Sequence, residues 1–351
     1  MKIADKKIGK DCPVFIVAEI SANHAGDFNR AVELIEKAKE SGADAVKFQA
    51  YTPDTMTIDA DNRYFKIKHP RWGGQTLYEL YKKAYTPWEW FKKLKKTADD
   101  TGILFFSTAF DKTSVDFLED LNVPVHKIAS FELVDHPLIK YTAGKKKPMI
   151  ISTGMGTLSD IRGALKAARG SGARDITLLR CTSSYPAYAQ EMNLNTIPDM
   201  HKKFKCPIGL SDHSLGNLAS IAAVCLGAVI VEKHFTLSRK IKSPDSFFSI
   251  EPAEFKDMVK NIRTAEDALG RVYYGMTKTE AESKIFRRSI FAVEDIKKGA
   301  RINKKNIRSI RPESGLAPKY MEEVLGASAR VDIKRGTPLT WKIINKKNKS
   351  R

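Results

Sequence analysis

Three pairs of polar residues, each two positions apart, are the residues of this chain best suited to chemistry. The pairs are Lys47 with Gln49, Ser211 with His213, and Glu232 with His234. Because side chains alternate between the two faces of a β-strand, both members of each pair would point the same way. Buried charges need partners, so the pairs form either a ligand site or a structural plug of ion pairs. Similar residues follow several other apolar segments, and this recurrence favours a site.

Two lysines and four serines predict a binding site for a small anion. Lys47 and Lys127 can each form charge-assisted hydrogen bonds to a phosphate or a carboxylate. Hydroxyl groups at the ends of other apolar segments would add donors, and they belong to Ser130, Ser152, Ser183 and Ser211. One serine at a strand end is uninformative, but the set as a whole suits a dianion or a trianion.

Two histidines predict a divalent metal ion beside the anion. His213 and His234 end consecutive apolar segments, so their imidazoles could bind one ion and leave positions open for water and substrate. The alternative is a hydrogen-bonded pair of neutral histidines. With two nitrogen ligands and oxygen donors for the remainder, Mn²⁺ or a similar ion fits better than structural zinc.

Four carboxylates follow the same apolar segments closely enough to reach the same site. They are Glu19, Glu132, Glu232 and Asp245. Each could bind sugar hydroxyl groups or transfer protons. Each could equally support a lysine or a histidine that contacts the ligand. The residue types alone leave both roles open for all four.

The elements that must position these residues are eight short segments rich in Val, Ile, Leu and Phe. The segments are residues 15–20, 44–49, 104–109, 125–130, 148–153, 177–183, 208–213 and 229–235. Most are followed by a helical pattern, such as Ala31, Leu34, Ile35 and Ala38 after the first segment. This alternation predicts an α/β fold, a parallel (β/α)8 TIM barrel whose site lies at the carboxyl ends of the strands.

The chain is longer than such a barrel needs, and its pattern changes toward the C-terminus. Strand-like segments separated by Gly and Asn turns, such as 289–296 and 307–312, predict a small β-rich domain. An insertion at 50–103 could act as a substrate lid or as an oligomerising loop. The predicted organisation is a barrel domain at 1–275, a linker at 276–285, the small domain at 286–345 and a basic tail at 346–351.

Composition and charge argue against several classes of protein. No apolar stretch is long enough to span a membrane and no apolar leader segment opens the chain, so we expect a cytoplasmic protein without a membrane partner. The net charge is +19, but the basic C-terminal region lacks the aromatic stacking platform of a nucleic-acid-binding surface. Polyanion binding by that region is kept as the non-enzymatic alternative.

Four cysteines show no disulfide or metal-binding pattern. They are Cys12, Cys181, Cys206 and Cys225, and no two of them have the spacing of a Cys-x-x-Cys motif. Their neighbours in the sequence are apolar. We therefore expect reduced, mostly buried thiols.

Nine motifs, in this order along nearly the whole chain, resemble the sialic acid synthase family. They are AEISANHAGDF (18–28), KFQAYTPDTM (47–56), KIASFEL (127–133), ISTGMG (151–156), CTSSYP (181–186), GLSDHS (209–214), EKHFTL (232–237), FRRSIFAVEDIKKG (286–299) and RPESGLAP (311–318). The resemblance implies condensation of phosphoenolpyruvate with an N-acetylated amino sugar and release of phosphate. It implies a divalent metal, usually Mn²⁺ with Mg²⁺ and Co²⁺ as alternatives, and a C-terminal antifreeze-like (SAF) domain in a domain-swapped homodimer.

Within that family, the insertion resembles the branch that makes pseudaminic acid. The evidence is TPDTMTID (52–59) and TLYELYKKAYTPWEW (76–90), and the implied substrate is a 2,4-diacetamido-2,4,6-trideoxyhexose of the altrose type. The alternatives are synthesis of sialic or legionaminic acid, and a catalytically inactive barrel that serves as a scaffold. Three departures from the family pattern are Gly73-Gly74 in place of Asp-Gly, Ala109 in place of Pro, and Glu313 in place of Gly.

The resemblance also implies a role for each matching residue. Phosphoenolpyruvate would contact Lys47, Thr108, Lys127, Ser130, Ser152, Ser183 and Ser211, and the metal would be held by His213 and His234. The sugar would meet Gln49 and Tyr185, with Arg311 arriving from the other subunit. Glu19, Glu232 and Asp245 would be the catalytic carboxylates, and Glu19 and Asp245 would also face the sugar.

Overall fold

The computed structural model describes residues 1–68 and 72–345, and these residues divide into two compact units. The first unit is Met1–Gly270 and the second is Arg271–Arg351. Each unit has a hydrophobic core of its own. The predicted basic tail, 346–351, lies outside the described residues.

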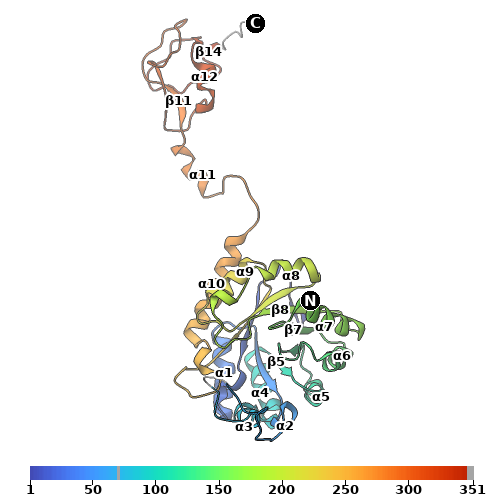
Figure 1. The fold of residues 1–351 in the computed structure, drawn as a ribbon. Helices are drawn as coiled ribbons and strands as arrows, with labels where there is room; N and C mark the ends of the chain where they lie inside the picture. Colours follow the sequence, from blue (N-terminus) through green and yellow to red (C-terminus); the bar gives the residue numbers. More distant parts are fainter. Residues whose placement is uncertain (69–71, 346–351) are drawn as a thin grey trace. The chain divides into compact units, whose positions relative to one another are not determined.

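The first unit is a closed barrel of eight parallel strands, as the eight apolar segments predicted (Figure 1). The strands are β3 (Phe15–Glu19), β4 (Ala45–Ala50), β5 (Leu104–Ala109), β6 (His126–Ile128), β7 (Met149–Ser152), β8 (Ile176–Cys181), β9 (Ile208–Asp212) and β10 (Ile230–His234). Strand β10 pairs with β3 and closes the barrel. Nearly every strand residue is buried, because the helices cover the outer face. The α/β barrel prediction is therefore confirmed.

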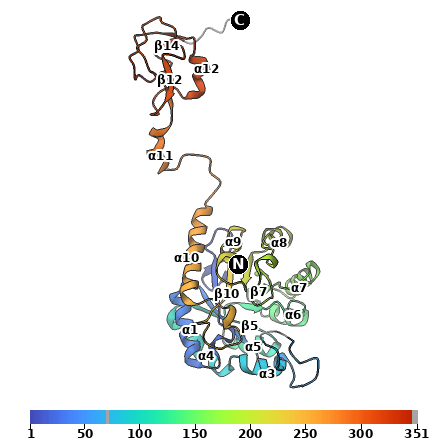
Figure 2. The ribbon, with the colours of Figure 1, turned by 60° about the vertical axis from the view of Figure 1, so that its left-hand side comes forward.

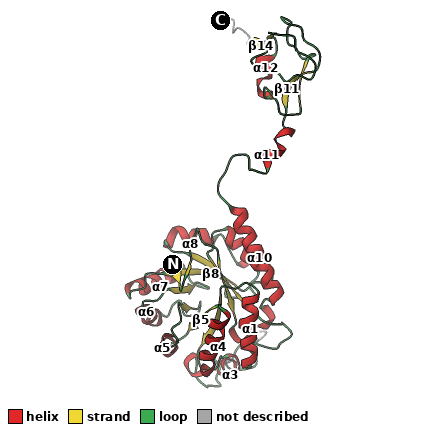
Figure 3. Ribbon diagram, turned by 180° about the vertical axis from the view of Figure 1, so that it is seen from behind, coloured by secondary structure: helices red, strands yellow, loops and turns green. Residues whose placement is uncertain are grey.

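Helices surround the strands on the outside of the barrel (Figure 3). They are α1 (Phe28–Glu40), α4 (Trp88–Thr101), α5 (Lys112–Asp120), α6 (His136–Gly144), α7 (Leu158–Gly170), α8 (Thr196–Phe204), α9 (Leu218–Cys225) and α10 (Pro252–Leu269). The predicted apolar stripe of α1 is buried, and Asp27 caps its first turn by accepting a hydrogen bond from the Arg30 backbone. Helix α10 has Pro252 in its first turn and ends at Gly270.

The insertion between β4 and α4 folds onto the face of the barrel where the strands end. It contains α2 (Pro53–Met56) and α3 (Leu77–Ala84), and each begins with a capping box. The Trp72 indole N–H donates to the carbonyl oxygen of Pro244, in the loop after β10, at 3.0 Å. Tyr51, directly after β4, packs edge-on against Tyr81 of α3. The insertion thus borders the predicted site, as a substrate lid would.

An N-terminal hairpin is an element that the sequence did not predict. Strands β1 (Lys2–Ile3) and β2 (Lys6–Lys7) are two residues each, too short to carry a periodic pattern. Ile3 and Ile8 nevertheless belong to the barrel core. No helix among the described residues is long and apolar enough to cross a membrane.

The second unit is built of short elements (Figure 2), and most of them enclose a core separate from that of the barrel. They are α11 (Glu280–Ser283), β11 (Ser289–Ala292), β12 (Ile307–Ile310), α12 (Met321–Val324), β13 (Ser328–Ala329) and β14 (Ile344–Asn345). Ile290, Ile302 and Leu339 are fully buried in that core. The predicted strands at 289–296 and 307–312 are present but shorter: they pair only over Ser289–Ala292 and Ile307–Ile310, and the chain bends directly after each, at 293–294 and 311–312.

The prediction that the cysteines are mostly buried is wrong. All four are free thiols, but only Cys181, which ends β8, is buried. Cys12 and Cys206 are partly exposed, and Cys225 ends α9 on the outer surface. Apolar neighbours in the sequence did not reveal which face of a helix or loop each thiol occupies.

Candidate active site

Most of the predicted site residues line one pocket at the carboxyl ends of the barrel strands. Those residues are Glu19, Lys47, Gln49, Thr108, Lys127, Ser130, Ser152, Tyr185, Ser211, His213, Glu232 and His234. Each strand of the barrel contributes a residue or a following loop, because parallel strands end at the same edge. Ser183 and Asp245 lie beside this group, and Arg311 belongs to the second unit.

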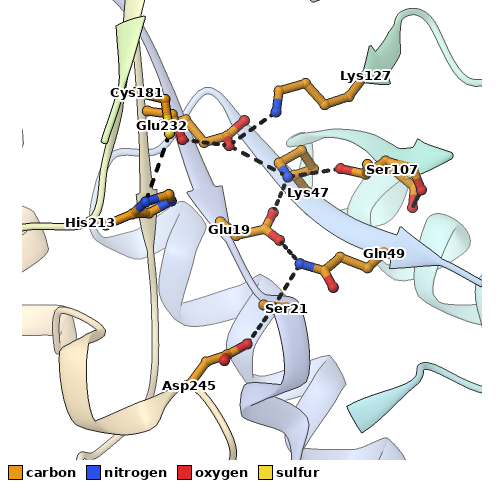
Figure 4. A network of polar contacts seen from close by, with 12 residues as sticks. Glu19, Ser21, Lys47, Gln49, Ser107, Lys127, Cys181, His213, Glu232 and Asp245 are labelled. Carbon is orange, nitrogen blue, oxygen red and sulfur yellow. Dashed lines mark hydrogen bonds and ion pairs between the residues drawn. The ribbon is translucent and has the colours of Figure 1, made fainter. Parts of the chain in front are cut away.

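Lys47 is the centre of a buried polar network (Figure 4). Its Nζ lies 2.7 Å from Glu19 Oε2 and 3.5 Å from Glu232 Oε1, and it donates to Thr108 Oγ1 at 3.0 Å. Lys127 reaches the same Glu232 oxygen at 3.4 Å, and Ser211 donates to it at 3.2 Å. The site therefore contains two cations and two carboxylates at close range, all shielded from water.

The net pKa shifts of the two carboxylates are opposite in direction, because the lysines outweigh burial at only one of them. Burial raises the pKa of Glu19 to about 7, although Lys47 opposes the shift. Burial would also raise the pKa of Glu232, but Lys127 and Lys47 outweigh it and the net pKa is lowered. The environment thus keeps Glu232 ionised and leaves Glu19 able to bind a proton near neutral pH.

Two of the predicted serines, Ser130 after β6 and Ser183 after β8, lie against Gly154, and the third, Ser152, ends β7. The Gly154 backbone N–H donates to Ser130 Oγ at 3.0 Å. A Cβ atom at this position would overlap Ser183 Oγ, so glycine is required for the close approach. Ser152 Oγ is buried and has no hydrogen-bond partner among the described residues. An unsatisfied buried hydroxyl beside two lysines is what a cradle for an anion requires.

The two histidines have the chemistry of metal ligands. Their rings lie 5.3 Å apart, and His213 Nδ1 is 2.9 Å from the carbonyl oxygen of Thr182. A carbonyl oxygen only accepts, so Nδ1 carries the proton and the Nε2 lone pair is available. Burial, and to a lesser extent the nearby His213 ring, lowers the pKa of His234 well below its usual value and keeps the His234 ring neutral. His234 Nδ1 is buried without a hydrogen-bond partner in the described chain.

The histidine pair alone would leave most of a metal's coordination to other ligands. Among the described residues, no group of three or more His, Cys, Asp or Glu side chains is arranged to hold an ion. Two imidazoles therefore fit an ion whose remaining ligands are water and substrate, as the sequence predicted. They do not fit a closed structural zinc site.

Polar residues on another side of the pocket form a chain that sequence reasoning found only in part. Gln49 Nε2 donates to Glu19 Oε1 and to Ser21 Oγ, both at 2.9 Å. Ser21 in turn donates to Asp245 Oδ2 at 2.5 Å. Ser21 was not predicted, although its place two residues after Glu19 could have indicated it. This chain presents amide, hydroxyl and carboxyl groups of the kind that bind sugar hydroxyls.

An aromatic wall connects the histidine pair with the insertion. Tyr185 lies 4.3 Å from the His213 ring and 5.9 Å from the Trp72 ring. Phe248 packs 4.7 Å from His234 and 5.1 Å from Tyr185. Trp72 was not predicted as a site residue, because its place depends on the path of the insertion. The wall offers an apolar surface beside the polar groups of the pocket.

Glu132 is a partly buried residue with one buried carboxyl oxygen, and the sequence left its role open. It lies two residues after Ser130, and one of its oxygens has no hydrogen-bond partner among the described residues. Burial raises its pKa to about 7, against the weaker effect of Lys127. A carboxyl group of this kind suits proton transfer near neutral pH.

Arg311 and the three departures from the family pattern have local structural settings. Arg311 is exposed, with its guanidinium 5.7 Å from the centre of the Phe286 ring. Glu313 lies 3.6 Å from Lys284 and so ties the turn of Arg311 to the preceding segment. Gly74 has a positive φ of 82°, which suits glycine, and Ala109 is buried at the end of β5.

Comparisons with known proteins agree with this geometry. The NeuB family profile matches residues 34–274, and the SAF domain profile matches residues 287–344. The chain is 44% identical to the pseudaminic acid synthase of Campylobacter jejuni over 94% of this chain and 96% of that protein. It is 38% identical to the N,N'-diacetyllegionaminic acid synthase of Legionella pneumophila over 97% of each.

A solved structure leads to the same family. The crystal structure of the N-acetylneuraminic acid synthetase from Leptospira borgpetersenii, in complex with citrate, superposes with a TM-score of 0.72. The two sequences are 32% identical, and the match covers 81% of this chain and 94% of that one. The resemblance that the motifs carried is therefore confirmed: this chain belongs to the NeuB family and ends in a SAF domain.

Proposed function

We propose that this chain condenses phosphoenolpyruvate with a 2,4-diacetamido-2,4,6-trideoxyhexose of the altrose type, giving pseudaminic acid and phosphate. The observation that carries the proposal is the buried anion cradle of Lys47, Lys127 and serine hydroxyls beside a pair of histidines. The higher identity to a pseudaminic acid synthase than to a legionaminic acid synthase, 44% against 38%, favours this product.

The proposed mechanism gives each polar group a task. The lysines and hydroxyls hold the phosphate and carboxylate of phosphoenolpyruvate, whose carbon 3 attacks the aldehyde carbon of the open-chain sugar. Water adds to the electron-poor carbon 2 and loses a proton, and the aldehyde oxygen takes up a proton in turn. Glu232, ionised at neutral pH, orients that water. The new hydroxyl group on carbon 2 then loses its proton and becomes the keto group as the bond between carbon 2 and the phosphate oxygen breaks, and Lys47 and Lys127 stabilise the phosphate that leaves.

A divalent ion fits the histidine pair, and His213 and His234 would hold it. When bound, such an ion polarises a carbonyl oxygen as a Lewis acid. We propose Mn²⁺, with Mg²⁺ and Co²⁺ as alternatives, because oxygen ligands would complete the coordination. Tyr185 and Phe248 pack against the two rings and fix their orientation.

Removal of divalent metal should abolish turnover, and Mn²⁺ should restore it. His234→Ala should lose this response while the barrel remains folded, because one of two protein ligands is missing. Phosphate release at increasing Mn²⁺ concentration measures the effect, and circular dichroism reports the fold. His201→Ala, which changes a histidine of α8 bonded to the Gly227 carbonyl, is the matched control. A fully active His234→Ala variant with no metal dependence would exclude the pair from the reaction.

The assignment of the sugar is tested by incubation with phosphoenolpyruvate and a panel of monoacetamido and diacetamido hexoses. Mass spectrometry should detect a nonulosonate only with the altrose-type diacetamido trideoxy sugar. A product from N-acetylmannosamine, or from the sugar that leads to legionaminic acid, would instead assign one of those syntheses. Salt-sensitive binding of polyanions without phosphate release would favour the non-enzymatic alternative.

We also propose that two copies form a domain-swapped homodimer. Large apolar side chains are exposed in the loops after β6, β7, β8 and β9 and at the first residue of α7, around the mouth of the barrel. They are Phe131, Val134, Met155, Leu158, Tyr188 and Leu215. Exposed apolar groups at one face mark an interaction surface. The proposed occupant is the SAF domain of a second copy, which would bring Arg311 of the partner subunit to the sugar.

A further inference from the structure

The two strands that carry the site histidines are joined on their outer face by a buried ion pair. Lys233 of β10 and Asp212 of β9 are register partners, and both are 1% exposed. The Lys233 ammonium lies 2.8 Å from Asp212 Oδ2. Because side chains alternate along a strand, Lys233 points away from the pocket while its neighbours Glu232 and His234 point into it.

The ion pair also holds the loop on the other side of His213. Lys233 donates to the carbonyl oxygen of Ser214 at 2.7 Å. Asp212 Oδ1 accepts from the Ser214 backbone N–H at 2.8 Å and from its hydroxyl at 2.6 Å. Asp212 Oδ2 accepts from Ser220 of α9 at 2.6 Å. His213 is thus flanked by two residues that the same network fixes.

Pairing of β9 with β10 does not by itself require this network. Two strands and a helix in a buried layer can be held by apolar side chains, and desolvation makes a buried ion pair an expensive substitute. What the charges add is geometric selectivity. Only one register places an ammonium against a carboxylate that also accepts from the next loop, so a slip or a tilt would break several bonds together.

We propose that Lys233 and Asp212 are positioning residues for the histidine pair, holding His213 and His234 at the separation that a divalent ion needs. The inference rests on the proposed metal site. It predicts that the two residues affect metal affinity through the backbone of β9, β10 and the loop at Ser214, without contacting the ion. Partners beyond the ligands of a metal commonly change its affinity by ~10–100-fold.

The decisive variant removes both charges together. Lys233→Met keeps most of the length of the side chain. Asp212→Asn keeps the oxygen that accepts from Ser214 and places an amide NH2 group, which can donate to the Ser220 hydroxyl, in place of the second oxygen. Each single change leaves the other charge buried without its partner and should lower Tm by about 5–10 °C. The double variant contains no unpaired buried charge, so its Tm should return to within a few degrees of the unmodified protein.

Calorimetric titration of the full chain with Mn²⁺, without substrate, separates positioning from stability. We expect a Kd ~10–100-fold weaker in the double variant even though its Tm has recovered. Lys147→Met, which removes the ion pair with Glu119 (3.0 Å) far from the histidines, should bind Mn²⁺ normally. A double variant that binds Mn²⁺ as tightly as the unmodified protein would overturn the positioning role.

The same titration also tests the proposed metal site separately from the positioning role. If the unmodified chain binds no Mn²⁺, or if His234→Ala binds it equally well, the histidine pair is not the metal site and the positioning role falls with it. If the unmodified chain binds Mn²⁺, His234→Ala does not, and the double variant is normal, only the positioning role is wrong.

Discussion

Replacing Glu132 by glutamine should make the protein more stable and much less active. At about pH 8 we expect the free energy of unfolding to rise by ~2–3 kcal/mol and kcat/KM to fall by ~100-fold or more. Burial raises the pKa of Glu132 to about 7, and one carboxyl oxygen has no partner among the described residues. Ionising this group therefore costs free energy in the folded state, and glutamine removes that cost.

The stability gain should depend on pH in a direction that the raised pKa fixes. Below the ordinary glutamate pKa of 4.5 the group is protonated in both states, and the substitution should change little. As the pH rises from 4.5 to about 7, the unfolded chain ionises while the folded chain resists, so the original protein loses stability. Above about 7 that loss is complete, and the advantage of the variant is greatest.

The loss of activity has a separate cause. We expect protonated Glu132, which is close enough to Lys127 for the ammonium group to lower its pKa, to supply a proton to the phosphate that leaves. The kcat/KM of the unmodified protein should then fall above about pH 7, and the variant should lack that limb.

Denaturant unfolding near pH 5 and near pH 8 measures the stability, and phosphate release measures kcat/KM. Glu40→Gln, at an exposed ion pair with Lys37 on α1, should change neither by a comparable amount. An unchanged rate in the Glu132 variant, together with the predicted gain in stability, would mean that the carboxyl group is buried without a catalytic role.

The barrel was predictable because its signals are local. Each strand is a short apolar segment with its polar residue at the carboxyl end, and the helix stripes and caps repeat at helical spacing. The N-terminal hairpin and the path of the insertion were not predictable. Ile3 is fully buried in the barrel core although its strand has only two residues, and Trp72 reaches Pro244 across a large sequence separation.

The site residues were predictable where polar side chains alternate along one strand. They were less predictable where their positions depend on a neighbouring strand or loop. The inward pairs Lys47 with Gln49 and Glu232 with His234 follow from the period of two. The same period of two predicts that the Lys233 side chain points outward. An outward lysine between two site residues would be interpreted as an exposed surface charge. Its pairing with Asp212 requires the register of β9 and β10, which residue types do not give.

Mixing two inactive variants should restore activity if the SAF domain acts on a partner's barrel. Lys127→Ala removes a buried cation of the anion cradle, and the loss of a charge-assisted hydrogen bond of ~1.5–3 kcal/mol should lower kcat/KM ~10–100-fold. Arg311→Ala leaves the barrel unchanged but removes the exposed guanidinium beside Phe286. It should impair the use of the sugar more than the binding of phosphoenolpyruvate.

In a swapped dimer, each site combines one barrel with Arg311 of the partner subunit. A mixed dimer then holds one site with both lesions and one site with neither. After random exchange of subunits about half of the dimers are mixed, so the activity should approach about a quarter of that of the unmodified protein. Native mass spectrometry of differently tagged chains establishes the exchange independently. If Arg311→Ala is impaired by itself, exchange occurs and no activity returns, Arg311 serves the barrel of its own chain, because only that arrangement leaves every site in the mixture defective. An Arg311→Ala variant that is fully active by itself would instead mean that Arg311 takes no part in the reaction.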